Sequence, residues 1–199
     1  MKELELVVTY AKRRSTKPSQ PKKTFIKNLL KRHFIQEVHN KVWVSDFTEI
    51  KIQGVPYYLC VILDLFSRKV VAHRVNYQKN ANLIINTFKD AFILRNKPND
   101  LLFHSDQGGE FTSHEFQSLL RTLHVKQSAS MPGVQYDNAV MESFYSIIKR
   151  EEIHKRNYQD FDELKKTISD YINFYNSYRP HRTFKNLTPD EFENRYFGI

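Results

Sequence analysis

The sequence is nearly free of cysteine, because its 199 residues contain only Cys60. A single thiol excludes a disulfide-stabilised scaffold and any zinc site built from several cysteines. Glycine and proline are also scarce, at five and seven residues, which excludes a low-complexity chain. No apolar run approaches the roughly 20 residues that span a bilayer, and the first residues, Met1–Glu5, have no apolar signal core. We therefore expect a protein of the reducing cytoplasm without a membrane partner.

Charge is distributed unevenly along the chain. The net charge is +9, and residues 1–40 carry ten Lys or Arg against three acids, while residues 41–199 carry 21 against 19. A basic arm before a nearly neutral body favours a polyanionic partner, most plausibly nucleic acid. A solvated, solubilising tail is the alternative reading of the charge alone.

Composition and breaker residues divide the chain into three parts. Hydrophobic residues make up 40% and charged residues 27%, as in an ordinary globular domain with a substantial core. Residues 11–23 hold two prolines and six basic residues without apolar periodicity, which predicts an extended linker. We expect a basic arm over 1–40, including a short helix near 24–34, a folded core over 41–155, and a C-terminal helical extension over 156–199.

Hydrophobic periodicity predicts an α/β fold with a mixed five-stranded sheet flanked by helices. Three closely spaced strands should form an antiparallel meander, and Thr188-Pro189-Asp190-Glu191 is a strong helix start. The expected strands are 42–50, 57–65, 69–75, 101–104 and 125–127, and the expected helices are 80–95, 113–123, 138–155, 160–178 and 188–196.

Three carboxylates occupy distinctive positions in this pattern. Asp46 lies within an apolar strand, Asp106 directly follows a buried strand, and Glu142 lies in the first turns of a helix. Taken singly, each would be a salt-bridge partner or a helix cap. Together they would supply only oxygen ligands, which suits Mg²⁺ or Mn²⁺ and not zinc.

The sequence around these acids resembles the catalytic core of DDE transposases and retroviral integrases. Asp106 and Glu142 are separated by 35 residues, the spacing of the D,D-35-E signature. The tail motif, Tyr175-Asn176-Ser177-Tyr178-Arg179-Pro180-His181-Arg182, is similar to the end of the second-frame (OrfB) transposases of the IS-three insertion-sequence family. The resemblance covers about residues 25–199.

This resemblance implies an RNase H-like fold and metal-dependent cleavage and strand transfer of DNA. Asp46, Asp106 and Glu142 would be the catalytic, metal-binding triad, with two Mg²⁺ (or Mn²⁺) ions acting on an in-line displacement. Lys149 lies seven residues beyond Glu142 on the same helical face and would contact DNA, with Arg150 as a weaker candidate. The implied partners are transposon ends, target DNA and further copies of the protein, in a bacterial, nucleoid-associated setting.

Neighbouring polar residues have more ordinary expected roles. We expect Asp64 to organise the turn after its strand, and Asp137 and Asn138 to cap the helix that carries Glu142. Asn138 also lies four residues before Glu142, where a contact with it is possible. His104 is expected to be a packed strand residue, and Glu110 is ambiguous between a local ion pair and a supporting contact in the site.

Two features limit the resemblance. His33 and His39 do not form the zinc site of a retroviral integrase, because that site also needs two cysteines. The helix-turn-helix recognition region that would precede the core does not occur in this sequence, so an upstream frame product is a possible partner. The alternatives are a decayed transposase that binds DNA without catalysis, and an RNase H-type nuclease, against which the spacing and the tail argue.

Overall fold

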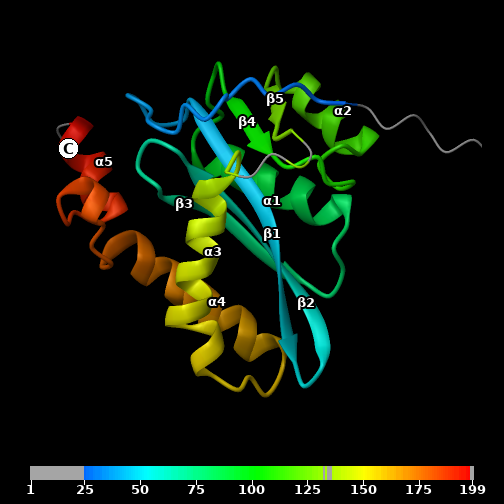
Figure 1. The fold of residues 1–199 in the computed structure, drawn as a ribbon, viewed down its shortest axis with the longest axis vertical. Helices are drawn as coiled ribbons and strands as arrows, with labels where there is room; N and C mark the ends of the chain where they lie inside the picture. Colours follow the sequence, from blue (N-terminus) through cyan, green and yellow to red (C-terminus); the bar gives the residue numbers. More distant parts are fainter. Residues whose placement is uncertain (1–24, 132, 134–135, 198–199) are drawn as a thin grey trace, which may run out of the picture.

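The structure, a computed structural model, describes residues 25–131, 133 and 136–197. Its centre is a five-stranded sheet in the order β3-β2-β1-β4-β5 (Figure 1). Strands β1, β2 and β3 form an antiparallel meander, whereas β4 and β5 run parallel to β1. The strands are β1 (Val42–Ile52), β2 (Val55–Asp64), β3 (Val70–Asn76), β4 (Leu102–Ser105) and β5 (Lys126–Ala129).

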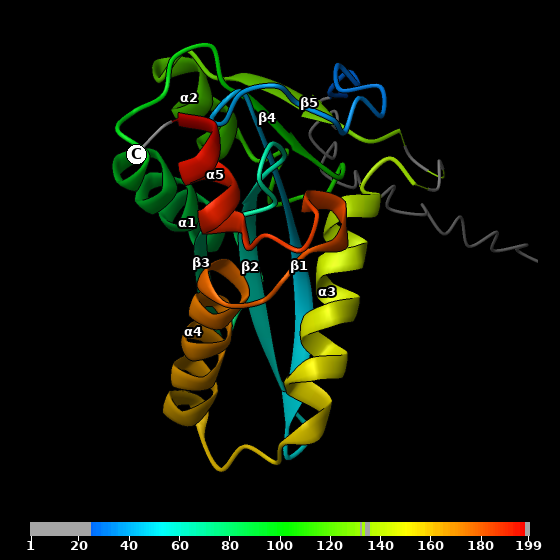
Figure 2. The ribbon, with the colours of Figure 1, turned by 90° about the vertical axis from the view of Figure 1, so that its left-hand side faces the viewer.

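Helices cover both faces of the sheet. Helices α3 and α4 lie on one face, α1 and α2 on the other, and α5 follows at the C-terminal end (Figures 1 and 2). The helices are α1 (Ala81–Leu94), α2 (His114–Thr122), α3 (Ala139–Glu151), α4 (Phe161–Ser177) and α5 (Pro189–Phe197), with short 3₁₀ turns at Ile153–Lys155 and Arg182–Phe184.

Alternation along β1 creates two separate apolar cores. Val42, Val44 and Ile50 pack toward α3 and α4, while Trp43 packs on the opposite face with the aromatic side chains of α1 and α2. Because successive side chains of a strand point to opposite faces, Asp46 lies on the α3 side of the sheet, between Val44 and Thr48 of the same face.

The expected mixed sheet, all of its strands and its five main helices are confirmed within one to three residues at most ends. Local capping explains several boundaries: Asn80 and Ser113 accept hydrogen bonds from the first turns of α1 and α2. Thr188 and Glu191 form a reciprocal capping box at α5, in which each side chain accepts the other's backbone N–H, at 3.1 and 2.8 Å.

One expected helix is wrong. Described residues 25–34 are not helical, and Lys31 and Arg32 adopt φ values of 47° and 63°, which a right-handed helix cannot include. The backbone N–H groups of Leu29 and Leu30 instead donate to the Ser128 hydroxyl on β5. Tertiary hydrogen bonds therefore replace the helical ones. The predicted linker over 11–23 lies outside the described residues.

No helix in the described part of the chain is long and apolar enough to cross a membrane.

Candidate active site

Asp46 and Asp106 lie side by side because of the parallel pairing of β1 and β4. Val44 on β1 is opposite His104 on β4, and the same register continued by two residues sets Asp46 beside Asp106. The Phe47 N–H donates to Asp46 Oδ1 at 2.7 Å, and the Gly108 N–H donates to Asp106 Oδ1 at 2.8 Å. Each carboxylate is thus oriented by a backbone donor close to it in sequence.

Glu142 reaches the same region from α3. It lies in the first turn of that helix with an exposed side chain. Three residues further on, the buried Tyr145 hydroxyl donates to the backbone carbonyl of Asp46 at 2.5 Å. This bond fastens the glutamate-bearing helix to the strand that carries the first aspartate.

The three acids line one cavity of about 450 Å³, called here the carboxylate cavity. Its other lining residues are Gln107, Gly108, Ser130, Met131, Gly133 and Asn138. Asn138 Oδ1 is buried and has no hydrogen-bond partner in the described part of the protein. No three His, Cys, Asp or Glu side chains among the described residues are gathered closely enough to hold a metal ion, so the triad shares a cavity without closing around one point.

Negative charge is concentrated and poorly compensated in this cavity. Burial raises the pKa of Asp46 to about 7, the Phe47 N–H bond opposes that rise, and the charges of Asp106 and Glu142 add to it. A carboxyl group held among other carboxylates favours either a proton or a cation. The donor set is all oxygen, which fits Mg²⁺ or Mn²⁺.

Gly108 provides the room that Asp106 needs. A Cβ at this position would lie 2.7 Å from Asp106 Oδ1 and 3.1 Å from Glu110 Oε2. Any side chain here would therefore displace the carboxylate. The glycine therefore allows the Asp106 carboxylate to accept the Gly108 N–H in this position.

Lys79 is a neighbour of the site that sequence reasoning missed. Its ammonium lies 3.7 Å from Glu110 and 5.3 Å from the centre of the Phe47 ring, and its charge lowers the pKa of Asp46. Glu110 is therefore in a local ion pair, one of its two expected roles. Lys79 follows β3 in a polar turn, and no sequence signal links it to Asp46.

The N-terminal segment also contributes unexpectedly to the rim of the cavity. The Gln107 side chain donates to the Ile26 carbonyl at 2.6 Å and accepts from the Ile26 N–H at 3.4 Å. The Gln107 side-chain amide thus bonds both backbone polar groups of Ile26, as a neighbouring strand would. These two bonds hold residues 25–34 against the loop that follows Asp106.

The expected capping role of Asp137 and Asn138 is wrong. Asn138 is the N-cap of α3 but makes no side-chain cap bond. Asp137 instead accepts from Arg32 at 2.7 Å and from Asn28 at 2.9 Å. A buried carboxylate beside a guanidinium gains more from the ion pair than from a neutral N–H, which explains why the local cap is not made.

Asp64 and His104 take the structural roles expected of them. Asp64 is fully buried and accepts the N–H groups of Asn40 and Phe66, at 2.6 and 2.9 Å, which organises the turn after β2. His104 is also fully buried, with its ring 2.8 Å from the Ser128 hydroxyl, and burial lowers its pKa.

Lys149 and Arg150 lie in the last turn of α3 and do not line the carboxylate cavity. Arg150 is exposed and lies 3.7 Å from Glu151. Any role for these two cations would be at a surface beside the cavity and not inside it.

Comparison with known proteins identifies related chains. Two families, both described as "Integrase core domain", match the chain. One matches residues 36–134 and the other matches residues 123–189. InsK of insertion sequence element IS150 from Escherichia coli is 34% identical over 170 residues, which cover 85% of this chain and 60% of that protein. The transposase of insertion sequence element IS904 from Lactococcus lactis is 36% identical over 167 residues, covering 83% and 66%.

A solved structure shows the same fold. The integrase catalytic core domain of HTLV-2 in complex with magnesium, in its dimeric form, superposes with a TM-score of 0.63 at 23% identity, over 78% of this chain and 97% of that one. The fold is therefore that of retroviral integrase cores, the RNase H-like architecture that the sequence resemblance implied. The chain spans about 60% of the length of InsK and 66% of the IS904 transposase.

Proposed function

Because the chain belongs to the integrase core domain family, we propose that it is the catalytic part of a transposase that cuts DNA strands and joins them to target DNA. The observation that carries this proposal is the carboxylate cavity. It brings together Asp46, Asp106 and Glu142 from two adjacent strands and a helix. The same cavity raises the pKa of Asp46 to about 7, mainly through burial.

Asp46, Asp106 and Glu142 would hold Mg²⁺ or Mn²⁺, and we propose two ions. Such ions, bound between carboxylates, activate the attacking oxygen and stabilise the leaving oxygen of a phosphodiester. The HTLV-2 integrase core is described in complex with magnesium. The three carboxylates that line the cavity offer oxygen ligands of the same kind here.

The chain's own residues would prepare the site before metal arrives. Asp46 and Asp106 are held by the Phe47 and Gly108 N–H groups, so little conformational freedom is lost when they bind a cation. Glu142 is exposed at the start of α3, and a small inward movement of its flexible side chain would complete the ligand set. Tyr145 fastens α3 to β1, so the movement would involve the Glu142 side chain and not the helix.

DNA would approach along α3. Lys149 and Arg150 at the end of this helix and Lys79 beside Asp46 supply positive charge on either side of the cavity. The basic arm 1–40 would add phosphate contacts without sequence preference. In this division, residues 41–155 form the catalytic core and residues 156–199 a helical extension that buttresses it.

The full reaction would need partners. We propose that transposon ends and target DNA are the substrates, that several copies assemble on DNA, and that an upstream helix-turn-helix product supplies end recognition. The site of action would be the nucleoid in the bacterial cytoplasm, since the two relatives compared above come from bacteria.

A decayed transposase that binds DNA without cutting it is the second candidate. One observation favours it: no three acidic side chains in the described residues close around a single metal position. The same observation is expected of an active enzyme whose Glu142 closes only on the ion, so the two candidates differ in activity and not in fold.

Strand transfer by a pre-cleaved DNA end in Mg²⁺ tests the proposal. Wild-type protein should join the end to plasmid DNA, and Asp46→Asn, Asp106→Asn and Glu142→Gln should each abolish joining while folding is retained. Asp170→Asn, a change of an exposed acid on α4, is the matched control. Wild-type protein that binds the DNA but never joins it would favour the decayed transposase. An Asp46→Asn variant that still joins DNA would show that the proposed triad is wrong.

A further inference from the structure

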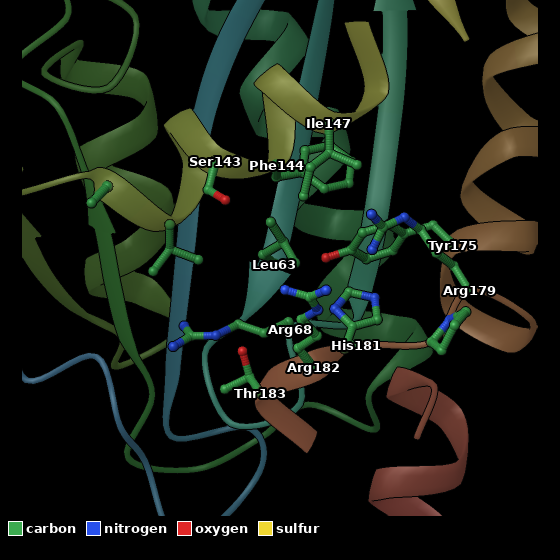
Figure 3. A pocket seen from close by; sticks show the side chains of 13 residues that line it. Leu63, Arg68, Ser143, Phe144, Ile147, Tyr175, Arg179, His181, Arg182 and Thr183 are labelled. Atoms are coloured by element: carbon green, nitrogen blue, oxygen red, sulfur yellow. The ribbon is translucent and has the colours of Figure 1, made fainter. Parts of the chain in front are cut away.

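The tail motif 175–182 encloses a second cavity on a different face of α3. This cavity, called here the arginine pocket, has a volume of about 520 Å³ and lies between α3, the turn after β2 and the segment that follows α4. Figure 3 shows Arg68, His181 and Arg182 gathered on one side of it, opposite Ser143, Phe144 and Ile147 of α3. Ser143 is the residue after Glu142, so the two cavities share a helix.

Part of the motif is explained by structural roles. The Asn176 side chain accepts the Val70 N–H at 2.9 Å and donates to the Val70 carbonyl at 3.0 Å, which joins α4 to the edge strand β3. Arg179 donates two bonds of 2.8 Å to Glu151 at the end of α3. These residues are paired within the fold, and Glu151 already occupies two of the five N–H donors of Arg179.

His181 and Arg68 are not explained in this way. His181 Nε2 and Arg68 Nη1 are both buried and without a hydrogen-bond partner in the described part of the protein. Arg68 is held in place because its Nη2 donates to the Phe34 carbonyl at 3.0 Å. The His181 ring packs edge-on against Tyr175, with ring centres 4.7 Å apart. A buried donor without a partner is costly, and Arg68 Nη1 has N–H groups available to a ligand in this cavity.

The charge of the pocket indicates which ligand fits. Three arginines line it, Arg68, Arg179 and Arg182, and no acidic residue of the described part of the chain does. The neighbouring Glu151 is already paired with Arg179. Ser143 and Thr183 add hydroxyl donors at the rim. Guanidinium groups with hydroxyls and an imidazole are typical of a site for a phosphate oxyanion.

We propose that the arginine pocket binds one phosphate group, supplied by the DNA backbone, through Arg68 and Arg182, beside the His181 ring. This inference rests on the proposed function for the source of the phosphate. Since Ser143 lies one residue round the helix from Glu142, DNA held here would pass beside α3 while its neighbouring segment lies at the carboxylate cavity. The pocket would therefore position the DNA and would take no part in the chemistry.

DNA-binding titrations at several salt concentrations test the proposal on the full chain. Arg182→Gln, at an exposed residue, and Arg68→Gln should each weaken binding of a labelled duplex several-fold and reduce the salt slope by about 0.9, the value for one lost phosphate contact. Arg121→Gln, an exposed arginine on α2 on the other face of the sheet, is the matched control and should change neither. Arg182→Gln keeps the test valid if Arg68→Gln does not fold.

The imidazole NMR signals of His181 identify the source of the phosphate. They should shift when DNA is added, and the shift should be lost in Arg182→Gln. If they respond to inorganic phosphate while the DNA affinity and slope of both variants stay at wild-type values, DNA is not the ligand and the proposal is wrong. If neither ligand moves them, the oxyanion site itself is wrong.

Running the titrations in an Asp46→Asn background separates this proposal from the catalytic one. Binding and its slope do not require cleavage, so the arginine pocket is judged even if no strand transfer is found. Conversely, if the wild-type enzyme is active and the pocket variants bind and join DNA as it does, the proposed phosphate site is wrong and the proposed catalytic function stands.

Discussion

Arg32 and Asp137, which are 105 residues apart in sequence, form an ion pair with a nitrogen–oxygen distance of 2.7 Å. Asp137 is buried and also accepts the Met131 N–H at 3.3 Å. The pair therefore joins the N-terminal segment to the residues that lead into α3. It is a connection between the arm and the helix that carries Glu142.

Removing the arginine should destabilise the protein. In Arg32→Gln the buried Asp137 loses its charged partner, and we expect a loss of about 1–2 kcal/mol in the free energy of unfolding, since Arg32 is half exposed. Urea denaturation measures it. Arg74→Gln is the matched control, because Arg74 pairs with Asp90 in a similar geometry but with both partners exposed, and it should cost less than half as much.

The same pair predicts a pH dependence. Burial opposes ionisation of Asp137, but the bonds from Arg32 and the Met131 N–H lower its pKa below the ordinary 3.8 overall. The stabilisation is therefore present above the unfolded pKa and is lost as the pH falls through the lower folded pKa. The difference in the free energy of unfolding between wild type and Arg32→Gln should be equal at pH 6 and pH 8. A difference that disappears near pH 6 would contradict the pairing.

Neutralising Asp46 should stabilise the metal-free protein. Its pKa of about 7, raised chiefly by burial, means that stability from this group is present below the unfolded pKa and is lost as the pH rises toward 7. Asp46→Asn avoids that loss, and we expect a gain on the order of 2–4 kcal/mol at pH 8 that shrinks toward pH 4. Thermal unfolding in EDTA at both pH values tests this, with Asp170→Asn expected to show no such gain.

Metal binding should depend on pH for the same reason. A cation must replace the proton that Asp46 retains near pH 7, so the affinity for Mg²⁺ or Mn²⁺ should fall as the pH drops below 7. Calorimetry in buffers of different ionisation enthalpy should detect proton release on binding. Asp46→Asn and Asp106→Asn should bind the ion much more weakly, and equal affinity at pH 6 and pH 8 would argue against Asp46 as a ligand.

Two adjacent glycines provide a stringent test of the geometry. Gly108→Ala should push the Asp106 carboxylate away and reduce strand transfer roughly 10- to 100-fold, because the new Cβ would lie 2.7 Å from Asp106 Oδ1. Gly109→Ala meets no atom within 4 Å and should be close to wild type. Equal activity of the two variants would show that the position of Asp106 does not matter.

Deleting residues 1–23 should weaken DNA binding without affecting chemistry. The deletion removes seven basic and two acidic residues, and each lost phosphate contact lowers the salt slope by about 0.9. Titrations with an inverted-repeat duplex and a scrambled one should show equal losses. A large preference for one duplex that is insensitive to salt and vanishes with the arm would instead assign sequence recognition to it.

The order of elements could be predicted from the sequence because it depends on local patterns, and the proposed triad comes from the family resemblance. Alternation along β1 and helical spacing in α1 and α4 specify which face of each element is buried. Asp106 follows a buried strand, and 35 residues separate it from Glu142. This spacing matches the signature of the family that the sequence resembles. That these three acids line one cavity was expected on this basis.

Other features depended on contacts that no local pattern encodes. The segment 25–34 has the composition of a short helix, yet it is irregular and is bonded to Ser128 and Gln107, which follow about 80 to 100 residues later. Asp137 looked like a helix cap and is instead the partner of Arg32. Lys79 pairs with Glu110, which lies 31 residues further along the chain.

The physical reason is the range of each interaction. Periodicity and capping act within one or two turns and are written in neighbouring residues, so the sequence by itself determined the elements, their faces and the acids they present. The pKa of Asp46, the partners of Asp137 and the arginine pocket around His181 depend on burial and on charges from distant segments. Only the tertiary structure decided these, because electrostatics in a protein interior are set by what the fold brings into contact.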